Sequence, residues 1–266
     1  MRQFLGITRE ALFSPGRVSD DAAILQNVAD HLRVAGHSVA TCSGDDARWP
    51  EATDETVVFT MSQGERALTR LQQWEAHGVR VVNSSVGVRN CQRHRTVPLL
   101  VQAGVAFPDS LLTDTAAETR LPDWIDAGRV WVKRGDVHAT EADDVVAAES
   151  RTATHAALQR FRERGITRAI IQRHIHGAVV KFYAVRGRFF YCVPPVEGSE
   201  ISPDVAQRID CVGQRAAQAL GVEVYGGDCV CSSDGGVTLI DLNDWPSYVR
   251  CRAAAAAAIA AHLEHK

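Results

Sequence analysis

The stretch Asp241-Leu242-Asn243-Asp244-Trp245-Pro246-Ser247-Tyr248 lies near the C-terminal end of this 266-residue chain and carries its most specific pattern. On a strand, side chains two residues apart point to the same side. Asp241 and Asn243 would therefore direct two oxygen ligands toward one point. The runs 227–231 and 237–242 predict a hairpin across Ser233-Asp234-Gly235-Gly236, which would bring Asp228 beside them.

Three hard oxygen ligands that leave room for water and phosphate oxygens suit Mg²⁺. We therefore interpret Asp228, Asp241 and Asn243 as candidate magnesium ligands. Spacing alone leaves a second interpretation open, in which the hairpin has polar residues on its solvent face.

Lys133 ends the apolar strand Val130-Trp131-Val132-Lys133. A buried ammonium is costly without an anionic partner, and a phosphate is one such partner. The alternative is a lysine that buries its aliphatic stem and leaves its charge in water.

The segment Gln172-Arg173-His174-Ile175-His176-Gly177 follows a further β-rich run. A segment that joins two lobes can present backbone N–H and C=O groups to an adenine edge. His174 and His176 share a strand face, so a zinc site is a second hypothesis, but no third ligand stands at a useful spacing.

The first third of the chain alternates strand and helix patterns. Strands are predicted near residues 4–8, 37–42, 56–61 and 78–83, with helices near 19–36 and 65–77 and Ser19 as the first helix cap. Such alternation predicts a parallel, Rossmann-like sheet. No G-x-G-x-x-G is present, so we do not expect a dinucleotide there.

Composition excludes several classes of protein. Hydrophobic residues make up 45% and charged residues 23%, which is typical of a globular chain. A net charge of -3 and a pI near 6.4 argue against nucleic-acid binding. No apolar stretch is long enough for a membrane span. Seven scattered cysteines without a C-x-x-C pair favour free thiols and a cytoplasmic protein.

Taken in order, these motifs resemble the ATP-grasp superfamily over essentially the whole chain. The most specific element is Asp241-x-Asn243-x-x-Pro246. The resemblance implies an α/β fold with an N-terminal Rossmann-like preATP-grasp domain over residues 1–87. Two α+β subdomains, residues 88–168 and 169–266, would enclose the nucleotide.

The resemblance also implies ATP and Mg²⁺ as cofactors and assigns residues to them. Arg95, in a helix near residues 92–103, occupies the place of a phosphate-binding Lys in the family, and Lys133 would contact the α-phosphate. The hinge that reads adenine would consist of Gln172, Arg173, His174 and Ile175. The magnesium ligands would be Asp228, Asp241 and Asn243.

Two branches of the superfamily look closest, the ribosomal-protein glutamate ligases and the inositol trisphosphate 5/6-kinases. We expect a ligase that activates a small-molecule or peptide carboxylate as an acyl phosphate for attack by an amine. A small-molecule kinase and a non-catalytic nucleotide-binding protein are the alternatives. A homodimer, the acceptor and the amine are left open.

Substrate residues follow from the same resemblance. His138, Lys181 and Arg9 are expected to face an anionic substrate, and Arg17 could add to their positive charge. Residues 190–201 lack the Arg with which ligases commonly hold the acyl phosphate, so Arg188 is the expected catalytic substitute.

Overall fold

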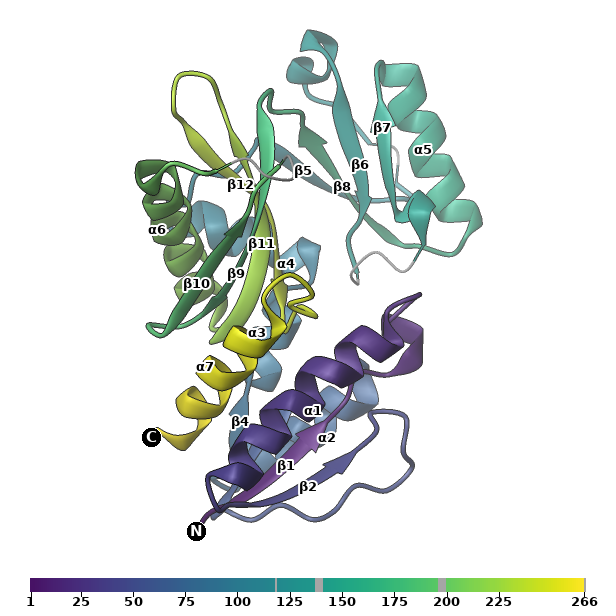
Figure 1. Cartoon of the computed structure of the whole chain (residues 1–266). Helices are drawn as coiled ribbons and strands as arrows, with labels where there is room; N and C mark the ends of the chain where they lie inside the picture. The colour runs from purple at the N-terminus through teal and green to yellow at the C-terminus, as the bar shows by residue number, and fades with distance from the viewer. Residues whose placement is uncertain (118, 137–140, 196–199, 266) are drawn as a thin grey trace.

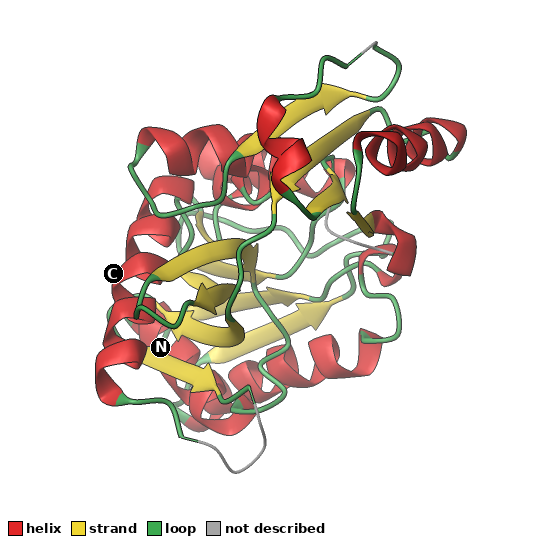
Figure 2. Cartoon of the chain, turned by 90° about the horizontal axis from the view of Figure 1, so that it is seen from above, coloured by secondary structure: helices red, strands yellow, loops and turns green. Residues whose placement is uncertain are grey.

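The computed structural model describes residues 1–117, 119–136, 141–195 and 200–265. Over these residues twelve strands form three four-stranded sheets, which we call the N-terminal, middle and C-terminal sheets (Figure 1). Seen from above, most of the helices lie around the outside of the strands (Figure 2). The expected α/β fold is therefore confirmed, and its layout decides where the functional side chains meet.

The N-terminal sheet is parallel, as predicted, and its two central strands are buried at nearly every position. On one face Phe4 packs with Ile24 of a first helix, and on the other Leu5 packs with Leu71 of a second. The first helix begins at Val18 with no side-chain cap, so the prediction that Ser19 caps it is wrong. The elements are β1 (Gln3–Ile7), η1 (Ala11–Phe13), α1 (Val18–Val34), β2 (Ser38–Cys42), β3 (Thr56–Thr60), α2 (Glu65–Ala76) and β4 (Arg80–Val82).

The middle sheet is antiparallel in the order β5-β8-β6-β7 and carries one long helix on one face. Ala157, Leu158 and Phe161 of that helix pack against the sheet. Its strand β8 extends to Arg173, beyond the boundary expected at residue 168. The elements are β5 (Ser110–Asp114), η2 (Asp123–Ala127), β6 (Val130–Arg134), η3 (Ala142–Asp144), β7 (Val145–Ala148), α5 (Arg151–Glu163) and β8 (Arg168–Arg173).

The C-terminal sheet is antiparallel in the order β10-β9-β11-β12, and the predicted hairpin forms its β11–β12 pair. A helix of 18 residues covers one face, with Gly213 so close to Phe182 that a Cβ would lie 2.9 Å from its ring. The elements are β9 (Ala178–Val185), β10 (Phe189–Val193), α6 (Pro203–Leu220), β11 (Val224–Cys231) and β12 (Val237–Asp244).

The helix expected near residues 92–103 is confirmed as α4 (Arg93–Gln102), and a short helix that was not predicted, α3 (Ser85–Asn90), precedes it. Ser84 caps α3 by accepting a hydrogen bond from the Gly87 backbone N–H. α4 packs against α6, and its Leu100 belongs to the core of the C-terminal sheet. This packing decides which arginine of α4 faces the site.

The last helix, α7 (Arg252–Glu264), lies beside α1, so the two ends of the chain are neighbours (Figure 1). One core joins these helices to the C-terminal sheet through Trp245, Tyr248 and Val185, all at most 1% exposed. This core covers one end of the sheet face that α6 does not cover. The other end of that face, which carries Lys181, Asp228 and Asp241, is left accessible.

Among the described residues, no helix combines the length and apolar character needed to cross a membrane.

Candidate functional site

Two rows of side chains cross the accessible face of the C-terminal sheet. The strand register places Lys181, Asp228 and Asp241 in one row. The next row consists of Tyr183, Gly226 and Asn243, each two residues away along its strand. Positions two apart on a strand share a face. The structure therefore brings the three candidate magnesium ligands to one face, with Asp228 directly opposite Asp241 and Asn243 one row away.

Cations already contact both carboxylates of the first row. Lys181 Nζ lies 2.9 Å from Asp228 Oδ1, and Arg93 Nη2 lies 3.0 Å from Asp241 Oδ2. Each of the two aspartate side chains is still 21% exposed, so a ligand can reach them. Burial raises the pKa of Asp228, against the opposing influence of Lys181. Two partly buried carboxylates facing each other form a site that favours positive charge.

Lys133 reaches this row from the middle sheet. It is only 8% exposed, and its Nζ donates a 3.2 Å hydrogen bond to the Ile240 carbonyl of β12. Burial lowers its pKa to about 8, while the charge of Asp241 acts in the opposite direction. The lysine therefore lies where two sheets meet, close enough to both aspartates for their charges to act on it.

A pocket of about 280 Å³ opens beside Lys133, between the middle and C-terminal sheets. Its walls are mostly apolar, and they include all four residues of the expected hinge. The lining residues are Trp131, Lys133, Val145, Gln172, Arg173, His174, Ile175, Gly177, Val179, Val230 and Ile240. The pocket has the shape and polarity for one flat, largely apolar ring system.

The two histidines of the hinge segment contact each other, and His174 also contacts Trp131. Trp131 Nε1 donates a 3.1 Å hydrogen bond to His174 Nδ1, and the rings of His174 and His176 meet edge to face at 4.6 Å. Burial is the largest cause that lowers the pKa of His174. Within the described ranges no three His, Cys, Asp or Glu side chains form a group that could hold a metal, so the zinc hypothesis has no support there.

A second cavity, of about 540 Å³, lies where the N-terminal unit meets the same face of the C-terminal sheet. We call it the polar cavity. Its walls come from the loop after β1, from Gln63, from Glu141 and from the ends of β9 and β12. The lining residues are Arg9, Phe13, Ser14, Pro15, Arg17, Asp21, Gln63, Glu141, Lys181, Tyr183, Asn243, Asp244, Pro246 and Ser247.

Arg9 lines the polar cavity, as expected, but its guanidinium already has partners. It pairs with Asp21 at 3.1 Å and donates hydrogen bonds to the carbonyls of Met61 and Trp245. Its side chain is 11% exposed. Arg9 therefore links the N-terminal sheet and its helices to the residues at the end of β12. Its guanidinium has few hydrogen-bond donors left for a substrate.

Arg95 and Arg93, two residues apart on α4, lie in different surroundings. Arg95 is exposed, and its side chain makes no hydrogen bond or ion pair with the described part of the chain. Arg93 is 8% exposed and lies between the sheets, with Nη1 3.4 Å from the Arg134 carbonyl and Nη2 on Asp241. Its Nε is buried and has no hydrogen-bond partner among the described residues.

Arg188, a further expected residue, lies outside both cavities. Arg188 is exposed in the turn between β9 and β10 and lines neither of them. His138 lies outside the described residues.

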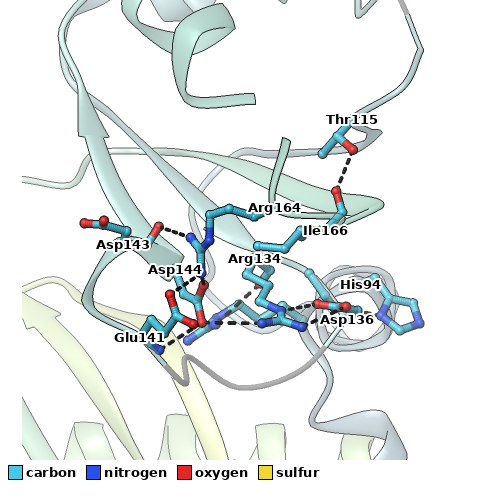
Figure 3. A network of polar contacts seen from close by, with 11 residues as sticks. His94, Thr115, Arg134, Asp136, Glu141, Asp143, Asp144, Arg164 and Ile166 are labelled. Atoms are coloured by element: carbon cyan, nitrogen blue, oxygen red, sulfur yellow. Dashed lines mark hydrogen bonds and ion pairs between the residues drawn. The ribbon is translucent and has the colours of Figure 1, made fainter. Parts of the chain in front are cut away.

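The segment after Lys133 is anchored by an ion network (Figure 3). Arg134 pairs with Asp136 at 2.7 Å, and Arg164 pairs at 2.6 Å with Asp144, a carboxylate with no exposed surface. His94 of α4 joins the network, because its backbone N–H donates a 3.0 Å hydrogen bond to the Gly135 carbonyl. The network thus ties α4, and with it Arg93, to the strand that carries Lys133.

Comparison with solved structures identifies the class of this fold. A D-alanine–D-alanine ligase from Bacillus anthracis, complexed with ATP, superposes with a TM-score of 0.73 and 12% identity over 98% of this chain and 92% of that one. A RimK domain ATP-grasp protein from Sphaerobacter thermophilus superposes with a TM-score of 0.72 and 16% identity, covering 98% of this chain and 99% of that one. The chain therefore has the ATP-grasp fold, as the sequence resemblance implied.

A third structure, the ATP-grasp ligase PsnB complexed with a minimal precursor, superposes with a TM-score of 0.64 and 19% identity, covering 98% of this chain and 97% of that one. No family model matches the sequence, and no curated protein is significantly similar to it. The similarity to these proteins is therefore one of fold and not of sequence.

Proposed function

We propose that this chain binds ATP between its middle and C-terminal sheets and uses it to activate a carboxylate for attack by an amine. The observation that carries the proposal is the convergence of Lys133 on Asp228 and Asp241 from the opposite sheet, beside an apolar pocket. The fold supports it, since one similar structure is a ligase complexed with ATP and another is a ligase complexed with a precursor.

The nucleotide would enter with its adenine in the 280 Å³ pocket, against the hinge residues 172–175. Its phosphates would then extend toward Lys133 and Arg93. Both side chains are buried cations whose charge a phosphate would neutralise, and the planar guanidinium can bind two oxygens at once. We therefore assign to Arg93 the phosphate role expected of Arg95.

The donor set fits Mg²⁺. Asp228, Asp241 and Asn243 are hard oxygen ligands on one sheet face, and the raised pKa of Asp228 indicates that a cation there would be stabilising. When bound, Mg²⁺ would screen the negative charge of the phosphates. Lys181 and Arg93, which now contact the two carboxylates, would then be free to contact substrate oxygens.

The chemistry requires positioning and charge neutralisation, and no protein nucleophile. A carboxylate oxygen of the acceptor would attack the γ-phosphorus, the bond to the β,γ-bridging oxygen would break, and ADP would leave. The amine nitrogen would then attack the acyl carbon, expelling phosphate and losing a proton. Lys133 and Arg93 would hold the phosphate chain, and the polar cavity would hold the acceptor. A small-molecule or peptide acceptor, a cytoplasmic location and a homodimer are further expectations.

The test is release of ADP from ATP and Mg²⁺ in the presence of carboxylate pools, with and without amines, followed by mass spectrometry of the product. A ligase requires both a carboxylate and an amine and yields an amide. ADP formation on a hydroxyl acceptor without an amine would instead support the kinase alternative. Nucleotide binding without any acceptor-stimulated ADP release would contradict both and leave a binding protein.

A further inference from the structure

The acidic side chains around the polar cavity already accept hydrogen bonds from other residues of the protein. Asp21 accepts hydrogen bonds from Ser14 at 2.5 Å and from Arg9 at 3.1 Å. Asp244 accepts one from Gln63 at 3.0 Å, and Glu141 pairs with Arg164 at 2.9 Å. Asp21 and Glu141 are thus each paired with an arginine, and Asp244 is hydrogen-bonded to the neutral amide of Gln63.

Two hydroxyl groups in the same cavity are different. Tyr183 and Ser247 are each 7% exposed and line the cavity. Among the described residues, neither side-chain hydroxyl has a hydrogen-bond partner. Neither hydroxyl oxygen is among the buried polar atoms that lack a partner, so both are open to the cavity. Two hydroxyl groups that face one cavity in this way can form hydrogen bonds to a ligand there.

Packing fixes the ring of Tyr183. It lies against Tyr248 with ring centroids 5.3 Å apart, and it is in register with Gly226, where a Cβ would lie 3.1 Å from Tyr183 Cδ1. The ring therefore rests over the glycine. Burial raises the pKa of Tyr183, so its hydroxyl keeps its proton at neutral pH and is able to donate.

A cation without a protein partner completes the group. Arg17 lines the cavity, is exposed, and its guanidinium makes no hydrogen bond or ion pair with the described part of the chain. Its positive charge acts on Tyr183. Two unpaired hydroxyls and a guanidinium together select a ligand that accepts hydrogen bonds and carries negative charge.

We propose that Tyr183, Ser247 and Arg17 form a subsite for a second oxyanion of the acceptor, a carboxylate or a phosphate group separate from the carboxylate that is activated. This inference rests on the proposed function, because the ligand is called an acceptor only if the chain activates a carboxylate. Tyr183 is one row from Lys181, Asp228 and Asp241, and rows on a strand are about 7 Å apart. The acceptor is therefore a small bifunctional acid, bound with one end in each row.

The experiment compares three probes by calorimetric titration of the full chain, with and without Mg²⁺ and a non-hydrolysable ATP analogue. Butyrate has one carboxylate, glutarate has two, and 3-phosphonopropionate has a carboxylate and a phosphonate. The variants are Tyr183→Phe and Ser247→Ala. Tyr191→Phe is the matched control, because Tyr191 is in register with Tyr183 on β10 but does not line the cavity.

We expect a dianionic probe to bind wild type at least about tenfold more tightly than butyrate, since hydrogen bonds to a charged group are the stronger kind. Preference for glutarate or for the phosphonate identifies the second group. Tyr183→Phe should remove most of that preference without changing butyrate binding, and Tyr191→Phe should retain it. Ser247→Ala should also lower the preference for the dianionic probe over butyrate.

Equal binding of all three probes to wild type would overturn the proposal, as would an unchanged preference in a folded Tyr183→Phe variant. Because the titration without nucleotide measures the subsite alone, its outcome does not depend on ATP turnover. Failure of the proposed function would appear separately, as absence of acceptor-dependent ADP release.

Discussion

Two cavities share one face of the C-terminal sheet, and they differ in how they are built. The 280 Å³ pocket is lined mostly by residues of β6, β8, β9, β12 and the hinge, and its walls are largely apolar. The 540 Å³ polar cavity is lined by loops and strand ends from all three units. A pocket made of strand residues suits an invariant ligand such as a nucleotide. A cavity made of loops can vary with the acceptor.

The largest expected effect tests the row of Lys181, Asp228 and Asp241, which lies between the two cavities: along β9, Val179 lines the 280 Å³ pocket and Tyr183 lines the polar cavity. Asp241→Asn keeps the shape and an oxygen toward Arg93 but removes the charge. We expect acceptor-dependent ADP release to fall by roughly a hundredfold or more, because the lost charge acts where charge develops during transfer. Asp234→Asn, in the turn of the same hairpin, is the control and should change the rate less than about twofold. Full activity in folded Asp241→Asn would remove the metal assignment.

The Lys133→Met variant distinguishes ATP binding near the 280 Å³ pocket from acceptor binding in the polar cavity. Methionine keeps the length and loses the charge, so ATP affinity should fall about 10- to 100-fold, the range for a hydrogen bond to a charged group. Titration with an ATP analogue measures it, and thermal unfolding shows that the fold persists. Binding of the dianionic probes without nucleotide should be unchanged. An unaltered ATP affinity would contradict the phosphate role.

The pH dependence of nucleotide binding should carry the signature of Lys133, whose pKa is lowered to about 8. Below pH 8 the free protein already carries the proton that the phosphate requires. Above pH 8 binding must take up a proton, so the dissociation constant should rise about tenfold per pH unit. Lys133→Arg stays protonated and should give a flat profile over pH 8 to 10. A flat wild-type profile would show that this lysine does not bind phosphate.

The smallest effects come from a matched pair of arginines on α4. Arg93→Ala should weaken nucleotide binding by roughly tenfold, since its guanidinium lies between Lys133 and Asp241. Arg95→Ala should change affinity and stability by less than about 0.5 kcal/mol, as is usual for an exposed side chain. Titration and urea denaturation of both variants measure this. The reverse ranking would return the phosphate role to Arg95.

Much of the fold was predictable because it rests on local periodicity. The parallel sheet of the first third, the β11–β12 hairpin and the strand that ends in Lys133 all follow from alternation of apolar residues and from turn residues at fixed positions. The same local pattern brought Asp228, Asp241 and Asn243 to one face. The hinge residues likewise lie together because they are consecutive in the chain.

The helix near residues 92–103 was predicted correctly and is α4 (Arg93–Gln102), but the sequence did not show which of its arginines would face the sheets. Residues two apart on a helix point about 200° apart, so the two arginines face opposite directions. Only the packing of α4 between the sheets decides which of them reaches Asp241.

The sequence by itself determined the parallel sheet of the first third, the β11–β12 hairpin with the face that carries the carboxylates, and the resemblance to the ATP-grasp superfamily. Only the tertiary structure showed that the guanidinium of Arg9 is already bound by other residues of the protein and that Arg188 lies outside both cavities. It also showed that Tyr183 and Ser247 line the same cavity. The reason is that Arg9 meets Trp245, and Tyr183 meets Ser247 at one cavity, across more than sixty residues of sequence. Local periodicity carries no information about such distances.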